Sequence, residues 1–265
     1  MHIKIAGKKA HYTNGGGKTS DVHACILIHG AGMDRSVWQL QTRALASMGV
    51  RVIAVDLPGH GKSEGDALSS ITEMANWIVE VMDAVDIKSA TLIGHSMGSM
   101  IALDMAANHP QRVDSMILLG VAEIMPVHED LLKAALDDQA LAAGLITYWG
   151  ISSGSMIGGR SAPGFSVMGA SQVLLEQSAS GVLYKDLMAC NEAGSMADTA
   201  SIITCPTQFI LAKRDKMTPL KSGLSLAAKI KNVDSLVLDD AGHMMMLESP
   251  NAVFKIMRTF IKNQL

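Results

Sequence analysis

The stretch Thr91-Leu-Ile-Gly-His-Ser-Met-Gly-Ser-Met-Ile-Ala-Leu-Asp-Met-Ala-Ala-Asn108 decides the fold that we predict for this chain. It begins as a short apolar run suited to a buried strand, and it ends with apolar residues at helical spacing. The turn between them, Gly94-His-Ser-Met-Gly98, has the pattern G-x-S-x-G, in which the glycines let a strand pass sharply into a helix. We therefore expect Ser96 in a strained, exposed position near the positive end of that helix, where a nucleophile is favoured.

The same five-residue pattern occurs a second time, at Gly150-Ile-Ser-Ser-Gly154. The residues that follow it, Ser155 to Gly164, are too rich in glycine and proline to sustain a helix. The pattern alone is therefore a weak signal. The strand before it and the helix after it favour Ser96 over Ser152 as the nucleophile.

Composition limits the classes of function. The 265 residues suit one large α/β domain with an insertion. Lysine and arginine number 22 against 25 aspartates and glutamates, without blocks of like charge, which argues against nucleic acid, anionic membranes and strongly acidic substrates. Cys25, Cys190 and Cys205 lack metal-ligand spacing, so they are predicted to be buried thiols in a reducing compartment. The N-terminal residues lack an apolar core of signal-peptide length, so we expect a cytoplasmic protein.

Strand and helix patterns alternate along most of the chain. A hairpin is expected over residues 3–12, and buried strands over 24–28, 50–55, 115–119, 206–211 and 235–238. Helices are expected over residues 37–48, 71–85 and 251–262, and another helix follows Pro219 and ends at residue 230. The alternation predicts a mostly parallel sheet with helices on both faces, whose catalytic groups gather beyond the carboxyl ends of the strands. The glycine-rich Asn14 to Ser20 does not fit a phosphate-binding loop, and we predict a flexible turn there.

The alternation breaks between residues 121 and 196. Within residues 139–175 the one formal charge is Arg160, among Gly, Ser, Ala, Met and aromatic residues. The stretch is too rich in glycine and serine for a membrane span, which needs about 20 mainly apolar residues. We predict an inserted lid, apolar on its underside, over a core made of residues 1–120 and 197–265; the alternative is a surface loop that tethers a few helices.

A serine hydroxyl needs a base to accept its proton, so the chain must supply a histidine at a strand end. His243 follows the last predicted strand, and Asp215 closes the strand before it, where its carboxylate can orient the imidazole. Glu123 is the alternative carboxylate, while Asp239 and Asp240 are too close to His243 in sequence. His60, in Asp56 to Ser63, is expected to fix a turn. In His29-Gly-Ala-Gly32 the glycines allow the backbone to approach a ligand closely, so the Ala31 amide can point into the space above Ser96.

The order Ser, Asp, His resembles that of the α/β-hydrolase superfamily. The matching segments are His29 to Gly32, Asp56 to Ser63, Gly94 to Gly98, Asp215 to Pro219, and Gly242-His243 with Glu248 and Pro250. The resemblance implies that the backbone amides of Ala31 and Met97 form an oxyanion hole and that residues 121–196 form a cap. The chain departs from the usual pattern at Ser99 and Ala212, where glycine is common, and at Met245, where proline often follows the histidine.

These residues predict a serine hydrolase that cleaves small to medium, largely apolar carboxylic esters through an acyl-enzyme on Ser96, with no cofactor and no metal. Activity is expected to fall below about pH 6.5, where an unperturbed imidazole is protonated. Trp149, Met217 and Met244 are the candidates for the pocket wall.

Other functions stay open. Carbon–carbon bond hydrolysis, lactone hydrolysis or perhydrolysis can use the same three residues, with Arg160 pairing with a substrate carboxylate. However, relatives that cleave carbon–carbon bonds usually carry Asn where this chain has His95. A ligand receptor or scaffold on the same fold is the alternative of another class.

Overall fold

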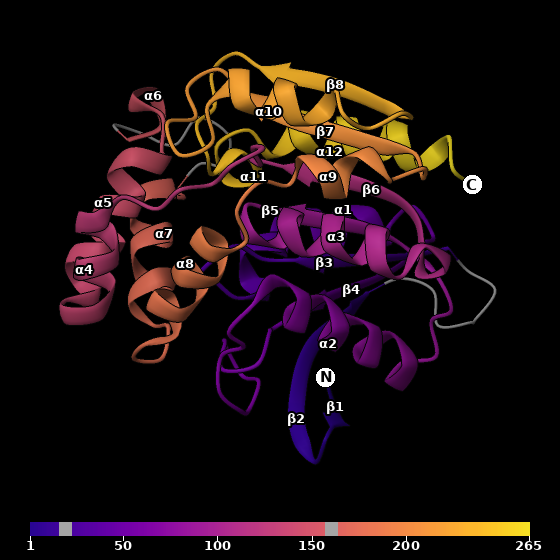
Figure 1. The fold of residues 1–265 in the computed structure, drawn as a ribbon, viewed down its shortest axis with the longest axis horizontal. Helices are drawn as coiled ribbons and strands as arrows, with labels where there is room; N and C mark the ends of the chain where they lie inside the picture. The colour runs from indigo at the N-terminus through magenta and orange to yellow at the C-terminus, as the bar shows by residue number, and fades with distance from the viewer. Residues whose placement is uncertain (16–22, 157–163) are drawn as a thin grey trace.

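The computed structural model describes residues 1–15, 23–156 and 164–265. Among these residues, eight strands form one twisted sheet in the order β1-β2-β4-β3-β5-β6-β7-β8 (Figure 1). Every pairing from β4 across to β8 is parallel, whereas the β1–β2 and β2–β4 pairings are antiparallel. The predicted mostly parallel sheet is therefore confirmed. The strands are β1 (His2–Ile5), β2 (Lys8–Gly15), β3 (Ala24–Ile28), β4 (Arg51–Val55), β5 (Ala90–His95), β6 (Val113–Leu119), β7 (Thr207–Ala212) and β8 (Val233–Leu238).

The predicted turn over Asn14 to Ser20 is wrong at its start. Asn14 and Gly15 belong to β2, where they pair with Ile53 and Val52 of β4. The sheet pairing supplies hydrogen bonds that the local sequence, read alone, does not reveal. Residues 16–20 lie outside the described part of the chain.

Side chains of the central strands alternate between two apolar cores, as the two-residue period of a strand requires. In β3, Ile26 and Ile28 pack on one face with α2, α3 and α10, while Cys25 and Leu27 pack on the other with α1 and α12. Both faces are thus covered, which explains why the strands are almost continuously apolar. The helices flanking the sheet are η1 (Arg35–Trp38), α1 (Gln39–Ala46), α2 (Ile71–Ala84), α3 (Met97–Asn108), η2 (Pro110–Arg112), α9 (Ala197–Ser201), α10 (Leu220–Ala227), α11 (Met245–Glu248) and α12 (Pro250–Lys262).

Local sequence determines where α2 begins. Ser70 adopts an extended conformation and its hydroxyl accepts a hydrogen bond from the Glu73 amide, while Glu73 in turn accepts one from the Ser69 amide. These contacts satisfy the Glu73 amide, which the first helical turn leaves unpaired, and the Ser69 amide just before the helix. Beyond the cap, apolar side chains three and four residues apart are buried against the sheet, among them Met74, Ile78 and Val81. Capping and spacing together fix the helix.

Residues 121–196 contain five helices among those described: α4 (Glu129–Asp137), α5 (Gln139–Gly150), α6 (Ser153–Met156), α7 (Val167–Glu176) and α8 (Val182–Glu192). Figure 1 shows them as a group at one end of the sheet. Its two connections to the sheet lie side by side, because Ile124 pairs with Ser195 and the Met196 amide donates to the Glu123 carbonyl at 2.8 Å. We call this helical group the cap; the division of the chain into core and cap stays a prediction.

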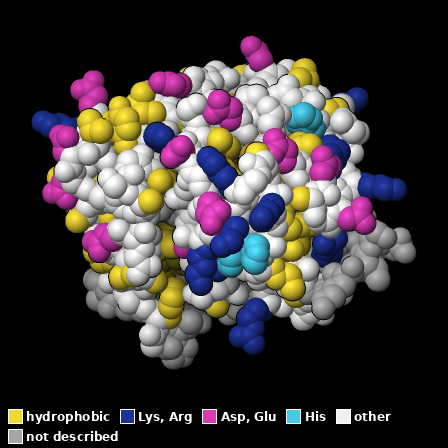
Figure 2. Space-filling view, turned by 90° about the horizontal axis from the view of Figure 1, so that it is seen from below, with side chains coloured by type: hydrophobic (Ala, Val, Ile, Leu, Met, Phe, Trp, Pro, Cys, Tyr) yellow, Lys and Arg dark blue, Asp and Glu magenta, His cyan; other side chains and the backbone are white. Residues whose placement is uncertain are grey.

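The surface is mixed in character. Acidic, basic and apolar side chains are interspersed on the face that carries the N-terminal hairpin (Figure 2). No helix among the described residues has the length and apolarity needed to traverse a bilayer. The three cysteines are free thiols: Cys25 and Cys190 are buried as expected, whereas Cys205 is only half-buried.

Candidate active site

Ser96 lies at a tight turn between β5 and α3, with φ 53° and ψ −117°. This left-handed conformation is strained for a residue with a side chain, as expected at a nucleophile turn. A Cβ at Gly94 would lie 2.3 Å from the Gly98 carbonyl oxygen, and a Cβ at Gly98 would lie 2.2 Å from the Ile28 carbonyl oxygen. Both glycines are therefore required by close backbone approach.

Ser99 stabilises this turn. Its hydroxyl donates to the carbonyl oxygens of Gly94, at 2.8 Å, and Leu119, at 3.1 Å. The Ser96 amide also donates to the Leu119 carbonyl, at 2.9 Å. The end of β6 thus holds Ser96 and Ser99 at fixed positions.

His243 and Asp215 are in direct contact. The His243 Nδ1 atom lies 2.8 Å from Asp215 Oδ2, and both side chains are buried. Asp215 also accepts hydrogen bonds from the amides of Met217, at 2.9 Å, and Thr218, at 2.8 Å. Burial alone would raise the pKa of Asp215, but the His243 charge and the hydrogen bonds from His243 and Thr218 outweigh it and hold the pKa below its ordinary value. Asp215 is therefore ionised at neutral pH.

The other candidate carboxylates lie elsewhere. Glu123 accepts a hydrogen bond from the exposed Ser225 hydroxyl. Asp239 and Asp240 form surface ion pairs with Lys213 and Arg214. Of the carboxylates considered, Asp215 is the one in contact with His243.

Ser152, in the second G-x-S-x-G motif, makes structural hydrogen bonds. The Ser152 hydroxyl lies 3.1 Å from that of Ser155 and donates to the Asp240 carbonyl. Its amide donates to Glu248, which also accepts the Gly242 amide, so Glu248 links the cap to the turn before His243.

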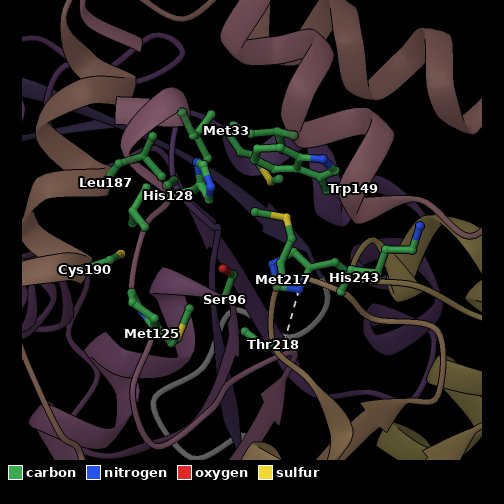
Figure 3. A pocket seen from close by; sticks show the side chains of 16 residues that line it. Met33, Ser96, Met125, His128, Trp149, Leu187, Cys190, Met217, Thr218 and His243 are labelled. Atoms are coloured by element: carbon green, nitrogen blue, oxygen red, sulfur yellow. Dashed lines mark hydrogen bonds between the residues drawn. The ribbon is translucent and has the colours of Figure 1, made fainter. Parts of the chain in front are cut away.

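A cavity of about 330 Å³ opens in front of Ser96 and lies between the cap and the sheet. Figure 3 shows Ser96 between Met217 and His243 on one side and Leu187 and Cys190 on the other. Ser96 and His243 both line this cavity, although no hydrogen bond joins their side chains. Such contacts are often long without substrate, so the geometry is compatible with proton transfer once a substrate is bound.

Ala31 also lines the cavity, and Met97 is the first residue of α3. Neither amide donates a hydrogen bond to another group within the described residues. The first amides of a helix have no partner inside it, so the Met97 N–H is free for a ligand. The two amides are thus available to bind an oxyanion.

Two of the three predicted pocket residues line the cavity and one does not. Trp149 and Met217 are half-buried in its wall. Met244 is 1% exposed and packs in the core against the sheet. The prediction for Met244 is therefore wrong: the amides of His243 and Met244 both donate to the Gly150 carbonyl at the end of α5, and the Met244 side chain packs into the core. Arg160, the other suggested substrate contact, lies outside the described residues.

Several residues that position His243 were not predicted from the sequence. His95 Nε2 lies 3.0 Å from the His243 carbonyl oxygen, and the two rings pack 4.7 Å apart. The Thr218 hydroxyl donates to Asp215 Oδ2 at 2.6 Å and lies 3.3 Å from His243 Nδ1. Only the position of Thr218 three residues after Asp215 gave a signal, because that spacing suits a side chain that caps a turn.

Gly120 gives the imidazole of His243 its space. It has φ +57°, and a Cβ there would lie 3.0 Å from His243 Nδ1. We expect Gly120→Ala to lower kcat by roughly tenfold to a hundredfold, since small displacements of catalytic groups are costly. Gly49→Ala is the matched control: it has φ +84° with nothing within 4 Å, so it shares the backbone strain but keeps wild-type kcat. Equal kcat values for the two variants would contradict this role of Gly120.

Two buried histidines make the fold sensitive to acid. Burial, followed by the nearby charge of His60, lowers the pKa of His29 from 6.5 to about 4. Burial, followed by the charge of His243, lowers the pKa of His95 from 6.5 to about 3. Below pH 6.5 these two histidines therefore bind protons in the unfolded chain but stay neutral in the folded chain. The free energy of unfolding falls as the pH falls.

We expect the free energy of unfolding to drop by about 2 kcal/mol for each of these two histidines between pH 7 and 5. The pKa of His60 is raised, because Asp186 outweighs the effect of burial, so His60 works in the opposite direction, but mainly above pH 6.5. Urea unfolding at pH 7 and pH 5 measures the difference, and His95→Asn is expected to roughly halve it. An unfolding free energy that is equal at both pH values would rule out this account.

Among the described residues, no three His, Cys, Asp or Glu side chains gather in a way that suits a metal ion.

Comparison with known proteins adds four observations. The profile of the alpha/beta hydrolase family matches residues 25–256. The chain is 42% identical over 99 residues to a dihydrolipoyllysine-residue acetyltransferase component of the acetoin cleaving system from Pseudomonas putida. The match covers 37% of this chain and 26% of that protein, so it spans about a quarter of that relative's length. It is 25% identical over 268 residues to (E)-2-((N-methylformamido)methylene)succinate hydrolase from Acinetobacter baylyi, covering 96% and 95% of the two chains. Among solved structures, Est816, described as an N-acyl homoserine lactone degrading enzyme, is 25% identical with a TM-score of 0.83 and covers 98% and 100%.

Proposed function

Because the chain belongs to the alpha/beta hydrolase family, we propose that it is a serine hydrolase that cleaves carboxylic esters. One observation carries this proposal. The His243 ring binds the Asp215 carboxylate through Nδ1 and lies in the wall of the cavity that also contains Ser96. A carboxylate, an imidazole and a strained serine in this order suit the transfer of an acyl group.

The proposed reaction has two halves. Ser96 Oγ attacks the ester carbonyl while His243 Nε2 accepts its proton, and the Asp215 carboxylate stabilises the imidazolium through Nδ1. The amides of Ala31 and Met97 bind the oxyanion. His243 then gives the proton to the leaving alcohol, which leaves an acyl group on Ser96. Water attacks that acyl group by the same route, which releases the acid and restores the serine.

The cavity favours small to medium, uncharged acyl groups. Its volume is about 330 Å³, near the lower end of the range of about 300–1,000 Å³ that is usual for ligand sites. Its walls are mainly apolar, with Met33, Met125, Trp149, Leu187 and Met217 around Ser96. Lys216 also lines the cavity, but its ammonium group lies over the exposed Tyr148 ring, 5.9 Å from the ring centre.

Lactones are the second candidate class of substrate. A lactone is an internal ester, so the same groups open its ring without any change in mechanism. The similarity to Est816, described as degrading N-acyl homoserine lactones, supports this candidate. We rank open-chain esters first because the proposed chemistry needs nothing that is specific to a ring.

Two measurements test the proposal. An alkyl fluorophosphonate is expected to label the protein once, on the peptide that contains Ser96. In a panel of p-nitrophenyl esters, kcat/KM is expected to be highest for neutral acyl groups of about four to eight carbons, consistent with a cavity of about the size of a small ligand site. Succinate monoesters are expected to react poorly, and lactones are measured alongside. No labelling and no turnover would instead favour a binding protein, and a preference for acidic esters would overturn the substrate class.

A further inference from the structure

A single carboxylate connects the cap to the loop His29–Met33. Asp186, on α8, is fully buried, and its Oδ2 atom accepts a hydrogen bond from the Gly32 amide at 2.8 Å. The same oxygen lies 2.7 Å from His60 Nε2. No hydrogen bond reaches Asp186 Oδ1 within the described residues. Both contacts therefore converge on one oxygen, next to the residue that carries the proposed oxyanion amide.

The loop is confined on two sides. A Cβ at Gly30 would lie 2.9 Å from His95 Nδ1, on the side of the nucleophile turn. A Cβ at Gly32 would lie 2.7 Å from Leu183, on the side of α8. Since a peptide unit is planar, the hydrogen bond from Gly32 to Asp186 fixes the orientation of the Ala31–Gly32 peptide. This peptide adjoins the one that carries the Ala31 N–H, so its orientation restrains the backbone at Ala31.

His60 is held as a cation. Its Nε2 faces the Asp186 carboxylate, and its Nδ1 lies 3.0 Å from the Pro58 carbonyl oxygen. Both neighbours accept hydrogen bonds, so both ring nitrogens must donate, and only the protonated ring can do this. Burial opposes this charge, but Asp186 outweighs it and raises the pKa of His60. The result is a buried ion pair between the core and the cap.

Stability alone does not explain this pair. Desolvation of two charges often costs more than their attraction returns, and apolar residues of similar size frequently serve as well. The neighbouring positions on the same face of α8, Leu183 and Leu187, are apolar and buried. A carboxylate at position 186 therefore needs another reason, and the Gly32 amide provides one.

We propose that Asp186 is a positioning residue that holds the oxyanion loop, and with it the Ala31 amide, in the geometry needed to bind the transition state. The inference rests on the proposed function. The same helix face also presents Leu187 and Cys190 to the cavity. Helix α8 thus joins the substrate pocket and the oxyanion loop in one rigid element.

The test compares Asp186→Ala and Asp186→Asn with wild type. The first readout is the second-order rate constant for phosphonylation of Ser96 by an alkyl fluorophosphonate, which does not require the natural substrate. The second is kcat and KM for a neutral p-nitrophenyl ester. We expect Asp186→Ala to lower the phosphonylation rate and kcat by roughly tenfold to a hundredfold, as misplacing an oxyanion donor does. KM is expected to stay within about threefold, because the pocket walls are unchanged.

Asp186→Asn is expected to fall between Asp186→Ala and wild type, since its amide oxygen can still accept the Gly32 N–H while the charge on His60 loses its partner. A trifluoromethyl ketone inhibitor is expected to weaken in parallel with kcat/KM, as a transition-state analogue does. Val81→Ala, a buried substitution in α2, controls for lost stability and is expected to keep wild-type rates at 25 °C.

The outcomes are distinct. Rates within twofold of wild type for both Asp186 variants, or a raised KM with unchanged kcat, would overturn the positioning role and leave Asp186 as a packing residue. Failure of the wild-type protein to react at Ser96 would overturn the proposed function itself.

Discussion

Ser96→Ala is expected to lower kcat for a neutral p-nitrophenyl ester by roughly 10⁴-fold or more, because the variant has no oxygen that can attack the carbonyl. KM changes little, since the cavity walls do not involve this hydroxyl. The residual rate comes from the oxyanion amides and from substrate binding, which continue to act on an attacking water molecule. Steady-state kinetics with highly purified variant protein measures the loss.

Ser152→Ala is the matched control for this experiment. Ser152 sits in the same five-residue pattern, but its hydroxyl bonds to Ser155 and to the Asp240 carbonyl. Its loss is expected to change kcat by less than twofold. If Ser96→Ala kept a tenth of the wild-type rate, the nucleophile would have to be another group.

Asp215→Asn is the second large effect, with an expected loss in kcat of roughly 10³-fold to 10⁴-fold. The amide group of asparagine presents N–H groups toward His243 Nδ1, which then loses its proton and accepts instead. The proton moves to Nε2, the atom that must accept one from Ser96. The ring is held in place but in the wrong tautomer.

Thr218→Val separates this tautomer effect from simple loss of a hydrogen bond. It removes the 2.6 Å contact with Asp215 Oδ2 but keeps the contact between Asp215 and His243. We expect a loss in kcat of less than about tenfold, in line with one hydrogen bond. Similar losses in the two variants would mean that Asp215 acts only through packing.

The sheet could be predicted because two independent patterns mark it in the sequence: apolar runs for the strands and helical spacing between them. Apolar runs such as Ala24–Ile28 and Ser115 to Leu119 are bounded by turn residues, and helical spacing separates them. Pairing across the sheet leaves no such local signal. Asn14 and Gly15 read as a turn, yet they pair with β4, because hydrogen bonds to a distant strand override local preference.

The contact between His243 and Asp215 could be predicted because both residues follow parallel strands, whose carboxyl ends meet at one edge of a sheet. Met244 shows the limit of that reasoning. A residue next to a catalytic candidate need not face the cavity: Met244 directly follows His243, yet its side chain is buried in the core.

Asp186 was missed for a different reason. Its sequence signal is a single acidic residue that directly follows Lys185 in a helix, and such a pair of charged residues usually marks a solvent-exposed position. Its partners, Gly32 and His60, are more than a hundred residues away in the chain. Only the packing of the cap against the sheet brings these groups together.

The chain enters the cap at Ile124 and leaves it at Ser195, and these two residues pair with each other. The cap is therefore a segment that can be exchanged at one junction. A recombination event, or a designed graft, that enters and leaves at these two residues would replace the helices over the cavity without breaking a strand of the sheet. A transplanted segment would still have to bring a carboxylate for the Gly32 amide. That single requirement would separate grafts that retain turnover from those that merely fold.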